Sequence, residues 1–159
     1  MTEFRGTPRA PATRRVALVV SRYHELITAR LLEGARACCR EHGVKDDHVD
    51  VLWTPGAFEL PVVAEAAASS GKYAAIVALG CVIRGETPHF DYVAGEAARG
   101  LGNVALAHQV PVGFGVLTVD TQDQAEARAG GSAGNKGFEA AEAALATADL
   151  LSQLPRASR

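Results

Sequence analysis

Four short runs of apolar residues occur along the chain, and longer stretches with helical spacing of apolar positions separate them. The first run, VALVVS, is continuous and rich in β-branched side chains, as is typical of a strand buried on both faces of a parallel sheet. Three comparable runs follow it. The four predicted strands cover residues 16–21, 48–54, 74–83 and 112–119.

The stretches between these runs predict helices. In the first stretch, Ile27, Leu31, Ala35 and Cys38 recur at spacings of three and four, and this helix is expected to end near Gly43. A shorter helix opens with the capping box TQDQ. The other predicted helices cover residues 60–70, 88–108, a short segment from Thr121 that Gly130-Gly131 closes, and the chain from about Lys136 onwards.

The predicted elements follow the order β-α-β-α-β-α-β-α-α. Alternating units of this kind are joined by right-handed crossovers and form a parallel sheet with helices on both faces. We therefore expect a four-stranded parallel sheet in an α/β fold of the flavodoxin-like three-layer sandwich type. The 159 residues fit one domain over 16–159, preceded by a flexible N-terminal arm over 1–15. Ligands bind such sheets beyond the carboxyl ends of the strands, which tells us where to look for a site.

Composition excludes several classes of function. A net charge of -2 gives no electrostatic reason to expect nucleic acid or an anionic membrane as a partner. No stretch has the length and apolarity of a membrane span, and the first fifteen residues lack the apolar core of a secretory signal. The three cysteines show no CxxC spacing, and Cys38 and Cys39 fit a helix as small buried hydrophobes. A reducing, cytoplasmic location is expected.

The segment after the third predicted strand combines a phosphate-binding pattern with a histidine. Thr87 is a plausible N-cap with Pro88 at the first helical position, so a helix starts here. Its free N–H groups and dipole favour an anion, which Gly85 allows to approach the backbone. His89 follows in the first turn, where the dipole favours neutral imidazole as a base. A helix start without a ligand and a structural histidine are the ordinary alternatives.

Other candidate residues follow the remaining elements. Tyr23 could stack on a planar ligand with His24 beside it, or both are ordinary loop residues. The Glu59 carboxylate could accept hydrogen bonds from the hydroxyl groups of a ligand, or it could simply complement the dipole of a helix. Arg128 is either a cation at a helix C-terminus or a fork for phosphate. Lys136 stands at the start of the last helix, the wrong end for dipole complementarity, which slightly favours a functional role.

Two common kinds of site are not predicted. Neither a GxxxxGK[ST] motif nor a GxGxxG motif follows the first strand, where the chain has Ser21-Arg22-Tyr23-His24 instead. Metal-ligand spacing is likewise absent from the sequence. Binding of a nucleotide by the usual loops is therefore disfavoured, and no metal site is expected.

Taken together, these segments resemble the lumazine synthase (6,7-dimethyl-8-ribityllumazine synthase) family. The matching stretches are SRYH, TPGAFELPV, ALGCVIRGETPHFDYVAGEAARGL, PVGFGVLT and TQDQAEARAGGSAGNKGFEAA, and the resemblance extends over nearly all of residues 16–151. Two departures stand out. Tyr23 replaces the more usual Phe or Trp, and Gly131-Ser132 stands where shell-forming relatives often have Thr-Lys.

The resemblance implies a cofactor-free condensation of 5-amino-6-(ribitylamino)pyrimidine-2,4-dione with 3,4-dihydroxy-2-butanone 4-phosphate. The products are 6,7-dimethyl-8-ribityllumazine, phosphate and water, in the penultimate step of riboflavin biosynthesis. The resemblance assigns acid/base catalysis to His89. It assigns phosphate binding to Gly85, Glu86, Thr87 and Arg128. It assigns contacts with the pyrimidine and ribityl chain to Tyr23, His24, Ala57, Phe58, Glu59, Cys81, Val82, Ile83, Phe114, Lys136 and Glu139.

The resemblance also implies a homopentamer, in some members assembled into an icosahedral shell, with active sites at the subunit interfaces. In that arrangement the adjacent subunit supplies Phe114, Arg128, Lys136 and Glu139. The residue pattern independently places Phe114 at the start of the fourth strand, far from the other candidates. The arm over residues 3–5 could extend a neighbour's sheet by strand addition, and riboflavin synthase is a further candidate partner.

Two other functions would fit the same fold. A catalytically weak protein that binds a flavin or a lumazine would keep the pocket, although the intact set of His89, Arg128 and Lys136 argues against it. An electron carrier that binds FMN would need a hydroxyl-rich phosphate loop after the first strand. Arg22-Tyr23-His24 occupies that place.

Overall fold

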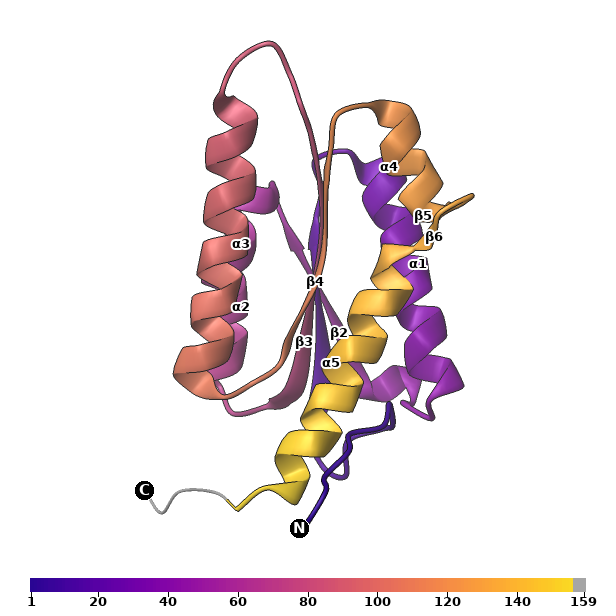
Figure 1. Ribbon diagram of the computed structural model, residues 1–159, viewed down its shortest axis with the longest axis vertical. Helices are drawn as coiled ribbons and strands as arrows, with labels where there is room; N and C mark the ends of the chain where they lie inside the picture. Colours follow the sequence, from indigo (N-terminus) through magenta and orange to yellow (C-terminus); the bar gives the residue numbers. More distant parts are fainter. Residues whose placement is uncertain (156–159) are drawn as a thin grey trace.

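A four-stranded parallel sheet forms the centre of the molecule (Figure 1), as the computed structural model shows for the residues it describes, 1–155. Its strands are β1 (Arg15–Ser21), β2 (Val49–Thr54), β3 (Tyr73–Ile83) and β4 (Val112–Val119). They pair in the order β2-β1-β3-β4, with every pairing parallel. The predicted α/β, flavodoxin-like arrangement is confirmed.

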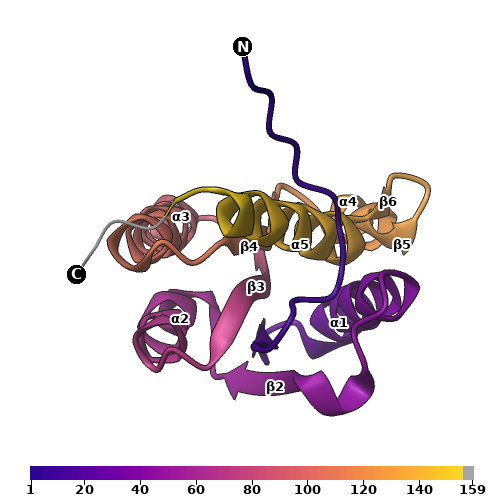
Figure 2. The same ribbon diagram turned by 90° about the horizontal axis from the view of Figure 1, so that it is seen from below.

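Two layers of helices cover this sheet, as Figure 2 shows from below. One layer holds α1 (Glu25–Glu41), α4 (Gln122–Arg128) and α5 (Lys136–Gln153). The opposite layer holds α2 (Leu60–Ser69) and α3 (His89–His108). Two 3-10 turns, η1 (Asp46–His48) and η2 (Ala57–Glu59), flank β2. No described helix combines the length and apolarity that a membrane crossing requires.

Two local predictions were wrong. His48 ends the turn η1 rather than beginning β2. The predicted closure of a helix by Gly130-Gly131 is instead a small antiparallel hairpin of β5 (Ala129–Gly131) and β6 (Gly134–Asn135). Gly130 and Gly134 have φ angles of 93° and 78°, which only glycine adopts without strain, so this segment turns back instead of continuing the helix.

The alternation of side chains along the strands divides the core into two clusters. In β1, Val16, Leu18 and Val20 pack toward α1 and α5, whereas Ala17 and Val19 pack toward α2 and α3. All five are fully buried because β1 lies between two other strands. This explains why the first apolar run is continuous rather than alternating. Cys38 and Cys39 are also buried, as predicted, and burial raises the pKa of their thiols to about 12 and about 11.

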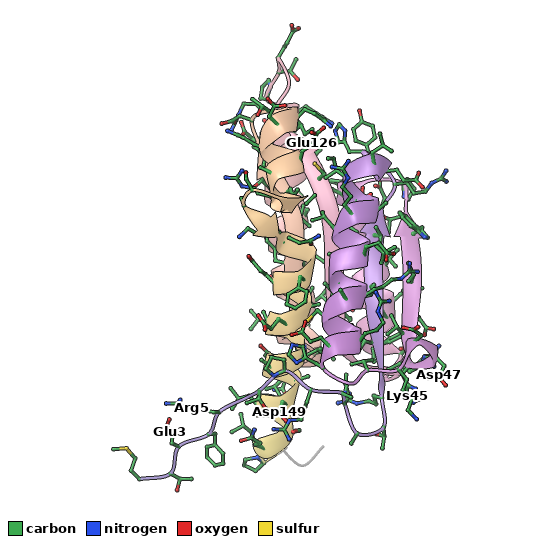
Figure 3. The ribbon with its side chains drawn as sticks, turned by 90° about the vertical axis from the view of Figure 1, so that its right-hand side faces the viewer. Glu3, Arg5, Lys45, Asp47, Glu126 and Asp149 are labelled. Atoms are coloured by element: carbon green, nitrogen blue, oxygen red, sulfur yellow. The ribbon has the colours of Figure 1, made fainter. Side chains whose placement is uncertain are left out.

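The N-terminal arm has no regular secondary structure and is partly fastened to α5 of its own chain. The backbone N–H of Thr7 donates to Asp149 Oδ2 at 2.9 Å, and Arg9 Nε lies 3.1 Å from Asp149 Oδ1. Figure 3 shows Glu3 and Arg5 at the outer end of the arm, beyond Asp149. Strand addition by residues 3–5 and flexibility of the arm stay predictions.

Candidate active site

The segments that follow β1, β2 and β3 all emerge at one edge of the sheet, because the strands are parallel (Figure 1). They carry Tyr23 and His24, then the turn η2, and then the loop between β3 and α3. This edge therefore brings together most of the residues that the sequence nominated. We call it the carboxyl edge.

After β1, Tyr23 presents its ring to solvent and is 67% exposed. Its ring meets that of His24 edge to face, with the centroids 4.7 Å apart. The backbone of His24 is left-handed, with φ 58°, and its carbonyl accepts hydrogen bonds from Ile27 and Thr28 at 2.9 and 3.0 Å. His24 thus starts α1, and partial burial lowers the pKa of its imidazole, which favours the neutral ring.

After β2, the turn η2 separates buried from exposed positions. Ala57 packs into the core with α2 and α3, while Phe58 is 58% exposed. The Thr54 hydroxyl donates to the carbonyl of Gly56 at 2.9 Å and fixes the turn. Glu59 lies half-buried beside Gly56, and its carboxylate has no hydrogen bond or ion pair with any residue of the described chain. It is free to accept hydrogen bonds from a ligand.

The last three residues of β3 differ in how they could meet a ligand. Cys81 and Val82 are buried on opposite faces of the sheet, and Ile83 is half-buried. Cys81 packs with the core beneath α1 and α5, where burial raises the pKa of its thiol to about 11. The side chain is therefore a neutral core group near neutral pH.

The loop after β3 is open and has unused backbone donors. Among residues 1–155, no acceptor meets the N–H groups of Gly85, Glu86 or Thr87. A methyl group added at Gly85 would meet no atom within 4 Å, so packing within the chain does not require glycine there. Three free amides beside an open space can hold an anion.

The helix that follows this loop begins one residue later than predicted. Pro88 is the N-cap of α3, and His89 is its first residue. The Thr87 hydroxyl still accepts from the His89 N–H at 3.4 Å, a long version of the expected cap. The side chains of Glu86 and His89 are exposed, and neither bonds to a group in the described part of the chain.

Arg128, Lys136 and Glu139 lie in the other helical layer, with the sheet between them and η2 or α3. Arg128 ends α4 and donates to the carbonyl of Gln124 at 3.1 Å. Lys136 Nζ lies 2.7 Å from Glu139 Oε2, one turn away on α5. The single chain therefore does not bring these three residues together with His89.

Asn135, which the sequence interpretation missed, fixes the start of α5. Its side-chain oxygen accepts from the N–H groups of Gly137 and Phe138 at 2.8 and 3.2 Å. Its amide donates to the carbonyl of Arg30 in α1 at 3.0 Å. A methyl group at Gly137 would overlap the carbonyl oxygen of Leu31, so these contacts hold α5 against α1 and set the position of Lys136. Asparagine before a helix was the available signal.

Phe114 lies in the edge strand β4. It pairs in register with Ala78, whereas the last residue of β4, Val119, pairs with Ile83. Five residues of strand separate Phe114 from the carboxyl edge, a distance of about 17 Å. Its ring is 48% exposed. The predicted separation of Phe114 from the candidates at the carboxyl edge is confirmed.

Arg84 is a second residue that the sequence interpretation missed. It follows β3 directly, and its Nε donates to Asp120 Oδ1 at 2.9 Å while Nη1 lies 3.5 Å from Asp91 Oδ1. Its Cζ atom lies 4.3 Å from the centroid of the Phe90 ring. No sequence motif predicts this cluster, because its members come from three separate segments.

Two hollows in the surface lie away from the carboxyl edge. One lies between the N-terminal arm and α5, beside Arg14 and Asp149, and the other lies between α1 and β2, beside Arg36 and Val51. Neither hollow includes a residue nominated from the sequence. The nominated residues thus stand on an open edge, not in either hollow of the single chain.

These features define a class of protein, namely a three-layer α/β sandwich that offers unpaired polar groups and free amides at the carboxyl edge of a parallel sheet. Residues 13–152 match a family model described as 6,7-dimethyl-8-ribityllumazine synthase. The chain belongs to this family, the lumazine synthases, which are transferase-type enzymes of riboflavin biosynthesis.

Proposed function

We propose that this protein condenses 5-amino-6-(ribitylamino)pyrimidine-2,4-dione with 3,4-dihydroxy-2-butanone 4-phosphate to form 6,7-dimethyl-8-ribityllumazine. The observation that carries the proposal is the carboxyl edge. It combines an exposed aromatic ring at Tyr23, an unpaired carboxylate at Glu59, free amides in the loop after β3 and an unpaired His89. A planar, hydroxyl-bearing substrate and a phosphorylated one need this combination of groups.

The two substrates occupy neighbouring parts of this edge. The pyrimidine stacks on Tyr23, and the ribityl hydroxyls donate to Glu59. The phosphate accepts hydrogen bonds from the amides of Gly85, Glu86 and Thr87. The Glu86 carboxylate would repel the anion, so this residue contributes its backbone only.

The condensation proceeds through several bond changes, each of which requires the transfer of protons. The substrate's amine attacks the ketone and loses water to form an imine, phosphate then leaves, and closure of the second ring expels another water. His89 lies in the first turn of α3 directly after the phosphate loop, where it can accept and return these protons. Alignment of two intrinsically reactive substrates supplies much of the rate, and no cofactor is needed.

The site is completed by a neighbouring copy of the chain. The sheet separates Arg128 and Lys136 from His89 within one subunit, and Phe114 is exposed on an edge strand. Supplied by an adjacent subunit, Arg128 forks to the phosphate, while Phe114, Lys136 and Glu139 close over the pyrimidine and ribityl chain. A homopentamer provides this head-to-tail contact between adjacent subunits, and each pentamer of a larger shell would keep the same contact.

The decisive experiment supplies both substrates to the assembled protein and measures lumazine by its absorbance together with released phosphate. We expect equal amounts of both products, and neither product when one substrate is omitted. Tight binding of lumazine without turnover would instead establish the weak binding protein. Light scattering on the same sample measures the assembly state, and an active monomer would contradict the shared site.

A further inference from the structure

The loop between β3 and α3 is fastened to the rest of the molecule through its first residue. The backbone N–H of Arg84 donates to the carbonyl of Val119 at 2.9 Å, which extends the pairing of β3 with β4 by one residue. Beyond this point, the amides of residues 85–87 have no acceptor within the described chain. The shape of the loop must therefore come from contacts at its two ends.

The Arg84 side chain supplies contacts at both ends. Its guanidinium donates to Asp120, the residue after β4, at 2.9 Å, and lies 3.5 Å from Asp91 in the first turn of α3. It also covers the Phe90 ring at 4.3 Å, a cation–π distance. One side chain thus ties the end of β3 to the end of β4 and to the start of α3.

The same contacts hold the Arg84 side chain within its own chain. Nε donates to Asp120, Nη1 lies beside Asp91, and the centre of the guanidinium lies over the Phe90 ring, so this cluster engages two of its three nitrogen atoms. An arginine side chain stays charged throughout the physiological pH range, and the Asp120 carboxylate raises the pKa of this guanidinium further. Its charge also offsets two carboxylates that would otherwise stand uncompensated near the loop amides and repel an anion.

We propose that Arg84 is a positioning residue that holds the loop over residues 85–87 in the form that accepts the phosphate group of the four-carbon substrate. This inference rests on the proposed function for the identity of the phosphate compound. It assigns to Arg84 no contact with either substrate. The loop amides receive the phosphate, and Arg84 determines where those amides lie.

The experiment compares steady-state kinetics of the parent with those of Arg84→Ala and Arg84→Lys in correctly assembled protein. We expect Arg84→Ala to raise the KM of the phosphorylated substrate by about tenfold or more, while the KM of the pyrimidine changes by less than about twofold. Arg84→Lys should recover only part of the loss, because an ammonium keeps the charge without the planar fork. Arg99→Ala removes an arginine–carboxylate pair with Glu96 elsewhere on α3 and serves as the matched control.

A second variant separates geometry from simple charge. If Arg84 acted only by offsetting carboxylates, Arg84→Ala combined with Asp91→Asn and Asp120→Asn would restore the KM, and that outcome would overturn the positioning role. An unchanged KM in Arg84→Ala, or an equal rise for both substrates, would overturn it as well. Persistent loss in the triple variant supports it.

Hydrogen exchange keeps the inference testable without turnover. In the parent, inorganic phosphate should slow exchange of the amides of residues 85–87, and Arg84→Ala should abolish this protection while the sheet amides stay protected. Equal protection in both proteins would overturn the inference. Should the parent form no lumazine from both substrates, the proposed function fails, and this exchange measurement still decides the role of Arg84.

Discussion

The two ends of the central sheet differ in how far their polar side chains are paired with one another. At the amino end, residues of three adjacent strands meet at the Asp50 carboxylate. Arg15 donates to it at 2.9 and 2.6 Å, the Tyr73 hydroxyl donates at 2.8 Å, and Lys72 Nζ lies 2.9 Å away. Figure 3 shows Lys45 and Asp47 near this end, where the carbonyl of Asp47 accepts from Arg15 at 2.6 Å.

At the carboxyl edge, apart from the Arg84 cluster, the side chains predicted to contact the substrates have no partners. The side chains of Tyr23, Glu59, Glu86 and His89 form no hydrogen bond or ion pair with any residue in 1–155. Polar groups that satisfy one another stabilise a fold, whereas groups left unpaired at one edge are available to a ligand or a second subunit. Changes at the amino end should therefore reduce stability and spare turnover. Changes to the unpaired side chains at the carboxyl edge should reduce turnover and spare stability.

The largest effect should come from mixing two impaired variants. Homogeneous His89→Ala and Arg128→Ala assemblies should both be severely impaired. Coexpression in equal amounts should leave about a quarter of the pockets free of either lesion, if one subunit supplies His89 and its neighbour supplies Arg128. The measurement is specific activity of co-purified mixed assemblies.

The matched control mixes the wild-type chain with a chain carrying both substitutions. A shared pocket predicts activity in about a quarter of the pockets, whereas a pocket formed within one chain predicts about half. Recovery in the first mixture that does not exceed the average of its two parents would contradict a pocket to which one subunit supplies His89 and its neighbour supplies Arg128.

Arg128→Ala alone should act selectively on the phosphorylated substrate. The substitution removes charge-assisted hydrogen bonds from the guanidinium to the phosphate but keeps the Tyr23 ring that stacks on the pyrimidine. Transition-state stabilisation should therefore fall by about 2–4 kcal/mol. The KM values of the two substrates, measured separately, check this expectation. An equal rise for both would remove the phosphate assignment.

His89→Ala should lower turnover by about ten- to a thousandfold, the range of one general acid/base. Since the His89 side chain bonds to no described group, the unfolding temperature and the assembly state should stay unchanged. Turnover within about twofold of the parent over the whole pH profile would show that water or the substrate's own phosphate carries the protons.

The sequence sufficed for the parts of this molecule that depend on local signals. Short apolar runs identified the four strands, and the spacing of Ile27, Leu31, Ala35 and Cys38 identified α1, because burial of a strand or a helix face leaves a pattern in neighbouring residues. The β5–β6 hairpin escaped detection since its strands have three and two residues, too few to show a period.

Contacts between distant segments could not be predicted in the same way. Arg84 and Asp120 are 36 residues apart, and Asn135 and Arg30 are 105 apart, so their pairing exists only once the chain has folded. The family resemblance supplied roles for Arg128 and Lys136 that residue patterns alone left open. The structure adds that the sheet separates both from His89, a consequence of which helices cover which face.

The smallest of these effects is expected at the amino end, from Asp50→Asn. The amide keeps the size of the side chain but leaves Arg15 and Lys72 without a counter-charge, which should cost about 1–2 kcal/mol at neutral pH after allowing for partial exposure to solvent. Turnover per folded subunit should not change, because Asp50 lies at the opposite end of the sheet from the proposed site. Urea unfolding at one fixed protein concentration, beside Asp123→Asn as an exposed and unpaired control, measures the difference.

Acid should reveal this contribution by removing it. The hydrogen bond from Arg15, followed by those from Lys72 and Tyr73, holds the pKa of the Asp50 carboxyl well below its usual range. A carboxyl whose pKa is lower in the folded than in the unfolded chain contributes stability that is fully present above the unfolded value of about 3.9 and is lost as the pH falls below it. The parent should therefore lose unfolding free energy more steeply than Asp50→Asn below about pH 4, and the two curves should converge. Parallel curves down to the acid limit would mean that Asp50 does not hold the amino end together through its charge. The contrast between an end whose polar groups pair with one another and an end whose polar groups are unpaired would then rest on the carboxyl edge alone.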